Sequence, residues 1–253
     1  MPPSRDELDR QLLRQAAWLS EHWKWLLKTK MIGERRLLGN MPTALDVGCG
    51  PGHVMSLLSD ALDVRGLDCD PWMVSECRRK GLNVVEGYAE QLPFEDRTFD
   101  IVYCSFLLLW VKDQSKVVEE MRRVSKKWVF CMAEPDYGLR KAYPDQLNRL
   151  NDPIVNGLRE EGADPFAGRK LQMLFSNGGI NATVGVHPGV MTLEQLMQET
   201  EGEWEWIRTT VSKDTNQGEL SATRTAWDEA LKNRSLFLFS PIFYAYAQVE
   251  EKS

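Results

Sequence analysis

Three glycines and two aspartates stand where a chain of this kind can bind a ligand. The stretch TALDVGCGPGHV places an aspartate and then three glycines at the end of a short apolar run: Asp46, Gly48, Gly50 and Gly52. Glycine adopts positive φ angles readily and lets a ligand approach the backbone. Asp68 ends the next apolar run, and a carboxylate in that place can accept both hydroxyl protons of a ribose. These residues indicate a site for an adenosine-bearing ligand.

The spacing of the glycines separates two classes of cofactor. Dinucleotide-binding proteins use GxGxxG, in which the third glycine allows helix and strand to pack closely. In this chain the third position is His53, whose imidazole obstructs that packing, and Pro51 stiffens the loop. The pattern therefore favours a cofactor without phosphate, whose ammonium and carboxylate need a nearby acid and exposed backbone groups. A nicotinamide-dependent oxidoreductase is the more distant alternative.

The elements that position these residues follow from an alternation of short apolar runs and helical segments that begins at residue 43. Strands are predicted at 43–47, 64–68, 83–87, 99–106, 127–134, 180–190 and 236–249. Helices are predicted between them at 53–59, 71–80 and 114–124. Strands that alternate with helices pair in parallel through right-handed crossovers. The sequence thus predicts an α/β fold with a doubly wound, mainly parallel sheet of seven strands.

Further helical segments flank this pattern. Apolar residues spaced by three and four positions from Leu8 to Met31 predict an amphipathic helix over 5–31, which we expect to act as a lid. Trp18 and Trp25 widen its apolar face, either to cover a cleft or to pack on the core. Residues 145–161, 168–177 and 192–234 are also predicted to be helical.

No Gly- or Pro-rich linker divides the chain, so we expect one domain over residues 1–253. Its predicted parts are an N-terminal lid helix (1–40), a cofactor-binding core (41–139), a helical insertion (140–179), and the C-terminal part of the sheet with its helices (180–253).

Composition excludes several classes of function. The formal net charge of −6 argues against nucleic acid and anionic membranes as partners. Five cysteines without a CxxC pair suggest neither a disulfide framework nor a zinc site, and they suit a cytoplasmic protein. The polar N-terminus and the short apolar runs indicate neither export nor a membrane span. No cluster of His, Asp or Glu has ligand spacing, so we expect a metal-independent reaction.

Three motifs together carry a resemblance to a known family. LDVGCGPG, then GLDCDPWMV, then GYAEQLPFEDRTFDIVYCSFLLLWVKD are similar in order and spacing to the class I S-adenosylmethionine-dependent methyltransferases. The resemblance covers residues 43 to about 134 and looks closest to the small-molecule branch that includes quinone-biosynthesis enzymes. It implies a Rossmann-like methyltransferase fold, S-adenosyl-L-methionine as cofactor and S-adenosyl-L-homocysteine as product.

The resemblance also implies roles for individual residues. Gly48, Gly50 and the neighbouring backbone of Cys49 and Gly52 would hold the methionine part, with Asp46 close to its ammonium. Asp68 would bind the ribose. The other implied cofactor contacts are Met73 on the adenine, Ala89 and Glu90 in the adenine pocket, and Cys104 with Ser105 beside the methionine. For Met73 and Cys104, packing in the core without any cofactor contact is an equally good interpretation.

Two departures from the family pattern affect the site. Tyr88 stands in GYAE where many members have an aspartate that binds the adenine amino group, so adenine recognition is expected to differ. The stretch LLLWVKD also lacks the histidine that quinone-type relatives commonly place after the fourth strand. A familiar general base is therefore absent.

Candidate catalytic residues lie instead in AEPDYG, at the end of the fifth strand. Glu134 and Tyr137 are the two candidates, and Pro135 holds Glu134 in extended backbone that could aim its carboxylate at the cleft. A turn stabilised by Asp136 is the alternative reading of this stretch. His187, which precedes a proline in GVHPG, is read as structural rather than as a base.

The expected function is methyl transfer from S-adenosylmethionine to a small, apolar or aromatic organic molecule. Aromatic and apolar residues in the flanking helices would favour such an acceptor if they face the cleft: Trp18, Trp23, Trp25, Phe166, Met173, Phe175, Trp204 and Trp206. The pattern leaves open whether O, N, C or S accepts the methyl group, and it carries no signal for oligomeric state. A non-catalytic scaffold or regulator with this fold is the rival hypothesis.

Overall fold

The computed structural model describes residues 4–38 and 41–249, without the side chains of residues 28 and 30–38. Its central feature is a sheet of seven strands in the order β3-β2-β1-β4-β5-β9-β7. Five strands run parallel: β1 (Thr43–Val47), β2 (Asp63–Asp68), β3 (Val84–Glu86), β4 (Phe99–Ser105) and β5 (Ser125–Pro135). The strand order reverses between β1 and β4, where open α/β sheets bind ligands. The predicted doubly wound, mainly parallel sheet is confirmed.

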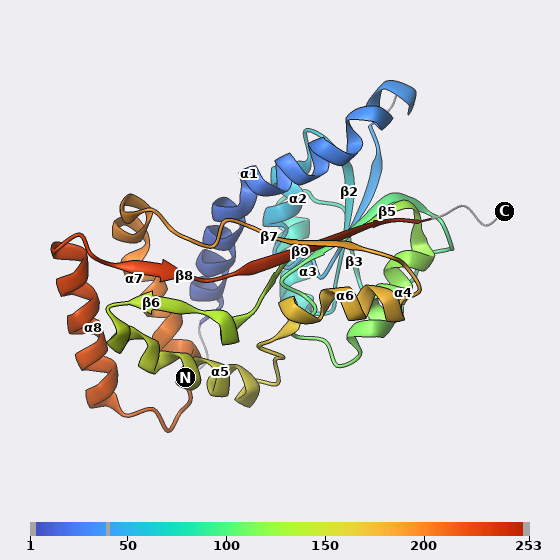
Figure 1. Ribbon diagram of the computed structural model, residues 1–253. Helices are drawn as coiled ribbons and strands as arrows, with labels where there is room; N and C mark the ends of the chain where they lie inside the picture. Colours follow the sequence, from blue (N-terminus) through green and yellow to red (C-terminus); the bar gives the residue numbers. More distant parts are fainter. Residues whose placement is uncertain (1–3, 39–40, 250–253) are drawn as a thin grey trace.

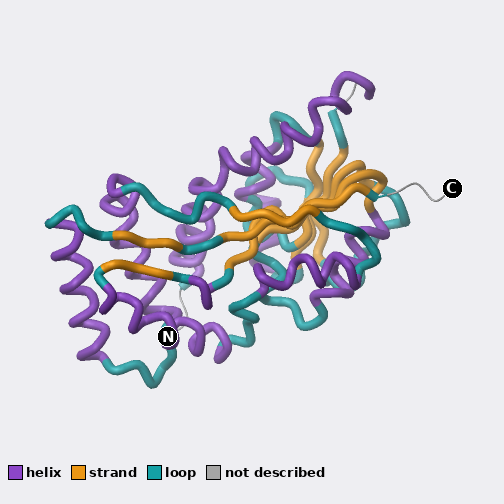
Figure 2. The backbone as a smooth tube through the Cα atoms, viewed as in Figure 1, coloured by secondary structure: helices purple, strands orange, loops and turns teal. Residues whose placement is uncertain are grey.

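Helices cover both faces of the sheet (Figures 1 and 2). The long helix α1 (Arg5–Leu38) and α2 (His53–Leu58) pack on one face, where Leu19 and Leu58 join Ile101 in one apolar cluster. On the other face α4 (Gln114–Val124) and α6 (Ala167–Asn177) pack on the inward side chains of β1, β4 and β5. The strands between them are apolar on both sides because both faces are covered.

Local signals in the sequence explain where several helices begin. The side chain of Asp70 accepts a hydrogen bond from Trp72 N (2.8 Å) and so caps α3 (Pro71–Arg79), whose first residue is proline. Asp113 caps α4 in the same way. A capping box formed by Thr192 and Gln195 begins α7 (Leu193–Thr210). Asn216 caps α8 (Gln217–Lys232).

The C-terminal part of the chain differs from the prediction. The single strand predicted over 236–249 is two strands, β8 (Phe237–Phe239) and β9 (Ile242–Gln248). Pro241 lies between them, and a proline has no N–H to donate to a ladder. β9 runs antiparallel between β5 and β7 (Thr183–Val186), whereas β8 pairs with β6 (Lys141–Tyr143) in a separate two-stranded sheet. The strand predicted over 180–190 is correspondingly shorter.

The region after β5 combines these strands with helices at one end of the molecule (Figure 1). It contains the 3₁₀ turns η1 (Tyr137–Leu139) and η2 (Asp145–Leu150), helix α5 (Asn151–Glu160), and α7 with α8. Their apolar faces form a second core around Trp204 and Trp227. The predicted insertion therefore has a strand, β6, that the helical pattern did not indicate, while the division of the chain into a lid, core, insertion and C-terminal part stays a prediction.

Within the described residues, no helix is both long and apolar enough to cross a membrane.

Candidate functional site

The loop between β1 and α2 depends on three glycines in left-handed backbone conformations. The φ angles are 71° at Gly48, 53° at Gly50 and 81° at Gly52. At Gly48 the positive φ favours glycine, and an added Cβ would lie only 2.6 Å from Cδ1 of Leu107, so the Leu107 side chain would have to shift.

Hydrogen bonds hold this loop against the end of β2. The amides of Gly48 and Cys49 donate to the carbonyl of Leu67 (2.7 and 3.0 Å), and Gly50 N donates to Oδ2 of Asp68 (2.8 Å). The second oxygen of Asp68 accepts a bond from Asp70 N (2.9 Å). Burial raises the pKa of Asp68, although these amide bonds oppose the shift. The carboxylate is thus fixed in place beside the glycine loop.

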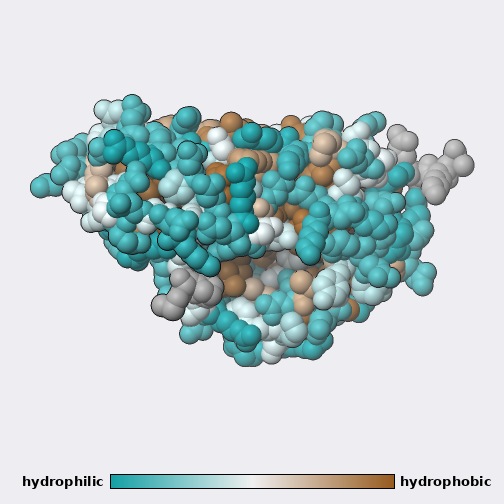
Figure 3. Space-filling view, turned by 90° about the horizontal axis from the view of Figure 1, so that it is seen from below, coloured by the Kyte–Doolittle hydropathy of each residue, from teal (hydrophilic) through white to brown (hydrophobic). Residues whose placement is uncertain are grey.

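A cavity of about 440 Å³ opens beside this loop, and we call it the loop-side cavity. Its floor is the glycine loop with the ends of β1, β2 and β4, and its cover is the first half of α1. A hollow with apolar residues along its walls is visible on the face shown in Figure 3. The sequence-predicted residues that line the cavity are Asp46, Gly48, Cys49, Gly50, Asp68, Met73, Ser105 and Tyr137.

Three buried polar atoms of residues that line the loop-side cavity lack partners among the described residues. They are Oδ2 of Asp46, Oγ of Ser105 and Nε1 of Trp23. Burial raises the pKa of Asp46 well above its usual range, and the neighbouring Tyr103 hydroxyl only partly offsets this. An unpaired buried carboxylate is costly, so a cationic group placed in the cavity beside Asp46 would stabilise it.

Other predicted contacts lie away from the loop-side cavity. Gly52, Ala89, Glu90 and Cys104 do not line it. Ala89 and Cys104 belong instead to the buried apolar cluster that also contains residues of α4 and α6. The Tyr88 side chain is 70% exposed. Residues near the end of β3 therefore surround the cavity less closely than the family pattern implies.

Glu134 does not face the cleft as the sequence analysis suggested. Its side chain is fully buried, Oε1 accepts bonds from Leu107 N (2.8 Å) and Leu108 N (2.7 Å), and Oε2 accepts one from Leu109 N (3.2 Å). Burial raises its pKa to about 8, and the three amide bonds oppose that shift. Pro135 keeps the backbone extended as expected, but the carboxylate points at the loop after β4 rather than at solvent.

The loop held by Glu134 begins with a strained residue. Phe106 has a φ of 53°, which bulky residues rarely adopt. Its amide donates to the carbonyl of Ala133 (2.7 Å), and the Glu134 bonds fix the three residues that follow. Such strain costs about 1–3 kcal/mol and persists only where surrounding contacts enforce it. Glu134 is therefore well placed to set the position of the Phe106 ring.

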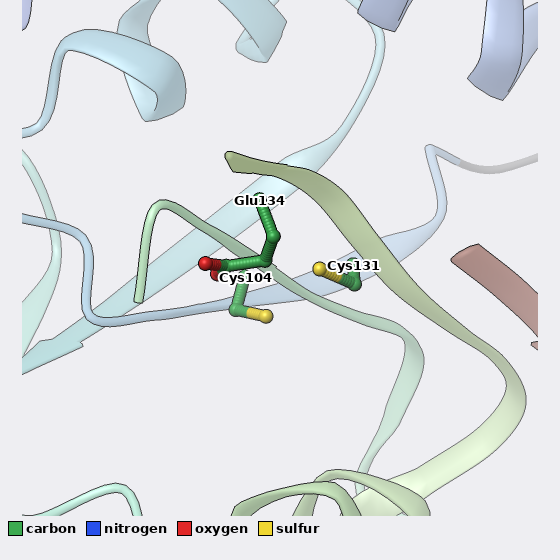
Figure 4. Close-up of side chains that lie close together, drawn as sticks. All are labelled: Cys104, Cys131 and Glu134. Carbon is green, nitrogen blue, oxygen red and sulfur yellow. The ribbon is translucent and has the colours of Figure 1, made fainter. Parts of the chain in front are cut away.

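Cys104, Cys131 and Glu134 lie together under this loop (Figure 4). Their potential ligand atoms are all within 4.8 Å of one another, which the spacing in the sequence did not indicate. All three side chains are completely buried, and both oxygens of Glu134 already accept amide bonds. The directly paired strands β4 and β5 explain their proximity.

Helix α1 closes the loop-side cavity. Leu8, Leu12, Ala16 and Trp23 project into it, and Asp9 contacts the loop through a 3.0 Å bond between its Oδ1 and Nε2 of His53. His53, which argued against a dinucleotide, thus joins the glycine loop to α1. Trp25 is 57% exposed and does not cover the cleft.

A second cavity of about 410 Å³ adjoins the first, and we call it the α7-side cavity. α1, α7 and the segment from Leu238 to Ile242 form its walls. Its charged residues are Arg14, Glu199 and Glu203. Of the residues that line this cavity, the sequence pointed only to the aromatic residues Trp18, Tyr137 and Trp206.

The two cavities share part of their walls. Gln11, Gln15, Phe106, Tyr137 and Trp206 line both. The rings of Tyr137 and Trp206 stack with centroids 5.4 Å apart. Burial raises the pKa of Tyr137 above its usual value, with Glu203 adding to the shift. Tyr137, a catalytic candidate from the sequence, therefore lies at the boundary between two chambers.

The remaining candidates lie outside these chambers. Asp136 accepts bonds from Gly138 N and from Arg169, which is the turn that the alternative reading proposed. His187 is buried, and its Nε2 lies 2.8 Å from the carbonyl oxygen of Met132. Phe175 and Trp204 are core residues, whereas Met173 is half exposed.

Comparisons with known proteins agree with this geometry. Residues 45–132 match the protein family described as "Methyltransferase domain". A demethylmenaquinone methyltransferase of Bacillus licheniformis is 36% identical over 196 residues, which cover 66% of this chain and 81% of the relative. The corresponding enzyme of Bacillus pumilus is 33% identical over 196 residues, with the same coverage.

Solved structures share the fold at low sequence identity. A protein described as a methyltransferase of an antibiotic biosynthesis pathway in Anabaena variabilis has a TM-score of 0.59 at 16% identity, covering 87% of this chain and 96% of that one. A SAM-dependent methyltransferase of Thermotoga maritima has a TM-score of 0.52 at 17% identity, covering 97% and 95%.

Proposed function

The chain belongs to the class I S-adenosylmethionine-dependent methyltransferases, and we propose that it binds S-adenosylmethionine in the loop-side cavity and the methyl acceptor in the α7-side cavity. It is an enzyme that methylates a small molecule. No finding favours the scaffold hypothesis or a nicotinamide-dependent oxidoreductase.

The residues around the loop-side cavity fit S-adenosylmethionine. The unpartnered carboxylate oxygen of Asp46 suits the ammonium of the methionine part, and Asp68 at the end of β2 suits the ribose hydroxyls. Met73 lies in the same wall and suits the adenine face. When bound, this cofactor supplies a methyl group already activated by its attachment to a sulfonium.

The observation that carries the proposal is the shared wall between the two cavities. Phe106, Tyr137 and Trp206 line both chambers, so a group held at the boundary is accessible from each side. Methyl transfer needs nucleophile, methyl carbon and sulfur in line, and good alignment is worth up to about 7–11 kcal/mol. The aromatic wall suits this alignment and excludes water from the reacting atoms.

Glu134 acts in this scheme as a positioning residue rather than as a base. Its carboxylate holds the backbone of Leu107, Leu108 and Leu109, and the Phe106 ring of the shared wall depends on that loop. Tyr137 is the predicted catalytic candidate that contacts the acceptor directly, since it lines the α7-side cavity. An acceptor with an apolar or aromatic body fits the many aromatic residues there.

Calorimetry with S-adenosylhomocysteine tests the cofactor part of the proposal. We expect saturable binding at one site, and S-adenosylmethionine should compete for it. Incubation with labelled S-adenosylmethionine and a small-molecule extract, followed by mass spectrometry, then identifies the acceptor. Demethylmenaquinone, the compound named in the relatives, is the first single compound to assay. Absence of S-adenosylhomocysteine binding to folded protein would falsify the proposal.

A further inference from the structure

The Glu203 carboxylate on α7 is the feature of the α7-side cavity that the methyltransferase fold does not explain. It lines the cavity and is partly buried. Among the residues described, none donates a hydrogen bond to it or forms an ion pair with it. Burial raises the pKa of Glu203, while the charges of Arg140 and Arg14 oppose the shift and Glu199 adds to it.

The other charges of this cavity are already engaged. Arg14 donates to the carbonyl of Gly202 (3.0 Å) and lies 4.0 Å from Glu199. Arg140 is buried and does not line the chamber; one of its NH2 groups donates to Oδ1 of Asn151 (3.0 Å), while its Nε has no partner among the described residues. The lining therefore carries one cation and two carboxylates, a net charge of −1, and Glu203 is the carboxylate without a partner.

Four aromatic residues line the same cavity as this carboxylate: Trp18, Phe106, Tyr137 and Trp206. The faces of aromatic rings attract cations, an effect of about 0.5–2 kcal/mol for each well-placed ring. A carboxylate combined with aromatic walls is the chemistry that selects an ammonium over a neutral hydroxyl compound, and it repels a carboxylate.

We propose that the methyl acceptor is a small primary or secondary amine with an apolar or aromatic body, and that Glu203 binds its ammonium and takes up a proton from it. The inference rests on the proposed function, because the amine must reach the boundary at Tyr137 from the α7-side cavity.

The proton balance of this step is complete. The ammonium of the amine donates one N–H proton to the ionised Glu203 carboxylate, which becomes a neutral carboxyl. The lone pair left on nitrogen forms the new N–C bond as the C–S bond of the sulfonium breaks, so the positive charge passes from sulfur to nitrogen. Solvent later removes the proton from Glu203. A carboxylate whose pKa is raised by burial is a stronger base than an exposed one.

Three ligands with one aromatic body test the proposal on the native protein. Phenethylamine, phenethyl alcohol and phenylacetate differ in carrying an ammonium, a hydroxyl and a carboxylate. In calorimetry with protein saturated with S-adenosylhomocysteine, we expect the amine to bind about tenfold or more tighter than the alcohol, since bonds between charged groups are worth about 1.5–3 kcal/mol. Equal binding of amine and alcohol, or tighter binding of phenylacetate, overturns the inference.

The Glu203→Gln variant tests whether Glu203 causes the preference for the amine over the alcohol. The variant should bind the amine and the alcohol within about twofold of each other, because the amide keeps the shape and loses the charge. Glu205→Gln is the matched control, since Glu205 lies on the same helix, lines neither cavity and pairs with Arg10 (3.6 Å). A Glu203→Gln variant that keeps the full preference for the amine contradicts the assignment.

Failure of this inference is distinguishable from failure of the proposed function. If S-adenosylhomocysteine binds to native protein and to both variants but no preference for the amine appears, only the acceptor class is wrong. If S-adenosylhomocysteine does not bind at all, the cofactor assignment fails first. Mass spectrometry of phenethylamine incubated with S-adenosylmethionine adds a chemical readout, for which the expected product carries the new methyl group on nitrogen.

Discussion

The loop-side and α7-side cavities are similar in size, about 440 and 410 Å³, but they are built in different ways. The floor of the first comes from strand ends and one loop, whose residues are close together in the sequence or follow successive strands. The second draws its walls from α1, from Tyr137, from α7 and from the break between β8 and β9. Helix α1 contributes to both. The first cavity thus depends on local backbone geometry, and the second on tertiary packing of distant segments.

Asp68→Ala should have the largest effect, and it should impair binding in the loop-side cavity but not in the α7-side cavity. Removing this carboxylate deletes the partner of Gly50 N and the expected partner of the ribose. Affinity for S-adenosylhomocysteine should fall by about a hundredfold, since hydrogen bonds to charged groups contribute about 1.5–3 kcal/mol each. Calorimetry measures the loss.

The matched control is Asp70→Ala. Asp70 caps α3 and does not line the loop-side cavity, so its loss should lower stability by about 1 kcal/mol and leave cofactor affinity unchanged. If both alanine variants lose affinity equally, the ribose role assigned to Asp68 is incorrect.

Glu134→Gln should affect both cavities, because Glu134 holds the loop that follows Phe106. We expect the free energy of unfolding to fall by about 2 kcal/mol at acidic pH, where Glu134 is a neutral carboxyl, since the NH2 group of glutamine would face the N–H of Leu109, whereas a carboxyl oxygen there still has a lone pair to accept that bond. Urea unfolding followed by circular dichroism measures this loss.

The pH dependence of stability gives Glu134→Gln a more specific signature. The pKa of Glu134 is about 8 in the folded chain and near 4.5 when unfolded, so the folded chain binds the extra proton between these values. The Glu134 contribution to stability therefore decreases as pH rises from 4.5 to about 8. The glutamine variant should lack this decrease.

Glu120→Gln is the control of opposite sign. Its bond to Arg123 lowers the pKa of Glu120, so its contribution to stability is lost as pH falls. The two glutamine variants should therefore change the pH dependence of the free energy of unfolding in opposite directions. If both change it in the same direction, burial does not raise the pKa of Glu134.

The contrast between the cavities also explains what the sequence could predict. Glycine spacing and the acid at the end of the next strand are local signals, and Gly48, Gly50 and Asp68, which they single out, all line one cavity; their contacts with the cofactor stay a prediction. The alternation of strands and helices was enough to predict the parallel sheet, because apolar runs joined by crossover helices define a doubly wound fold. The helix cap at Asp70 has the same local character.

The remaining features depend on contacts between distant segments. Glu134 lies at the end of β5, where the sequence predicted that its carboxylate faces the cleft. The direction of its side chain is set instead by the amides of Leu107 to Leu109, which no sequence pattern near Glu134 reveals. Glu203 lies on the amphipathic helix α7, where a partly buried acid looks like any solvated residue. The break at Pro241 was visible as a proline, but the pairing of β8 with β6 was not, because that partner lay in a region predicted to be helical.

Met191→Trp should impair the α7-side cavity alone. Met191 lines this cavity and not the loop-side cavity, and the larger indole would occupy space expected for the acceptor. Turnover of the identified acceptor should fall by about tenfold, the size of effect that small changes in pocket volume produce, while affinity for S-adenosylhomocysteine stays the same. Steady-state kinetics and calorimetry measure the two quantities.

Met197→Trp is the control, because Met197 is 62% exposed and lines neither cavity. A parallel loss of turnover in this variant would mean that bulk on this side of the molecule, rather than filling of the cavity, lowers the rate.

Asp9→Ala should have the smallest effect, and it tests the element that the two cavities share. Asp9 and His53 lie 3.0 Å apart, but burial lowers the pKa of His53 and the charge of Lys80 adds to this, while Asp9 opposes it. The imidazole is therefore neutral near pH 7, and the contact is a hydrogen bond from Nε2–H to the carboxylate rather than a full ion pair. We expect S-adenosylhomocysteine to dissociate up to about fivefold faster, the range measured for partly exposed polar pairs.

Two variants serve as controls. S-adenosylhomocysteine should dissociate from Asp9→Asn at close to the native rate, because the amide oxygen still accepts the bond. The rate should also be native in Glu21→Ala, since Glu21 lies on the same helix but outside both cavities. Stopped-flow fluorescence resolves these rates. Equal rates in Asp9→Ala and native protein would mean that apolar contacts from Leu8, Leu12 and Ala16 alone close the cavity, and that the loop-side cavity depends on α1 through packing in the same way as the α7-side cavity does.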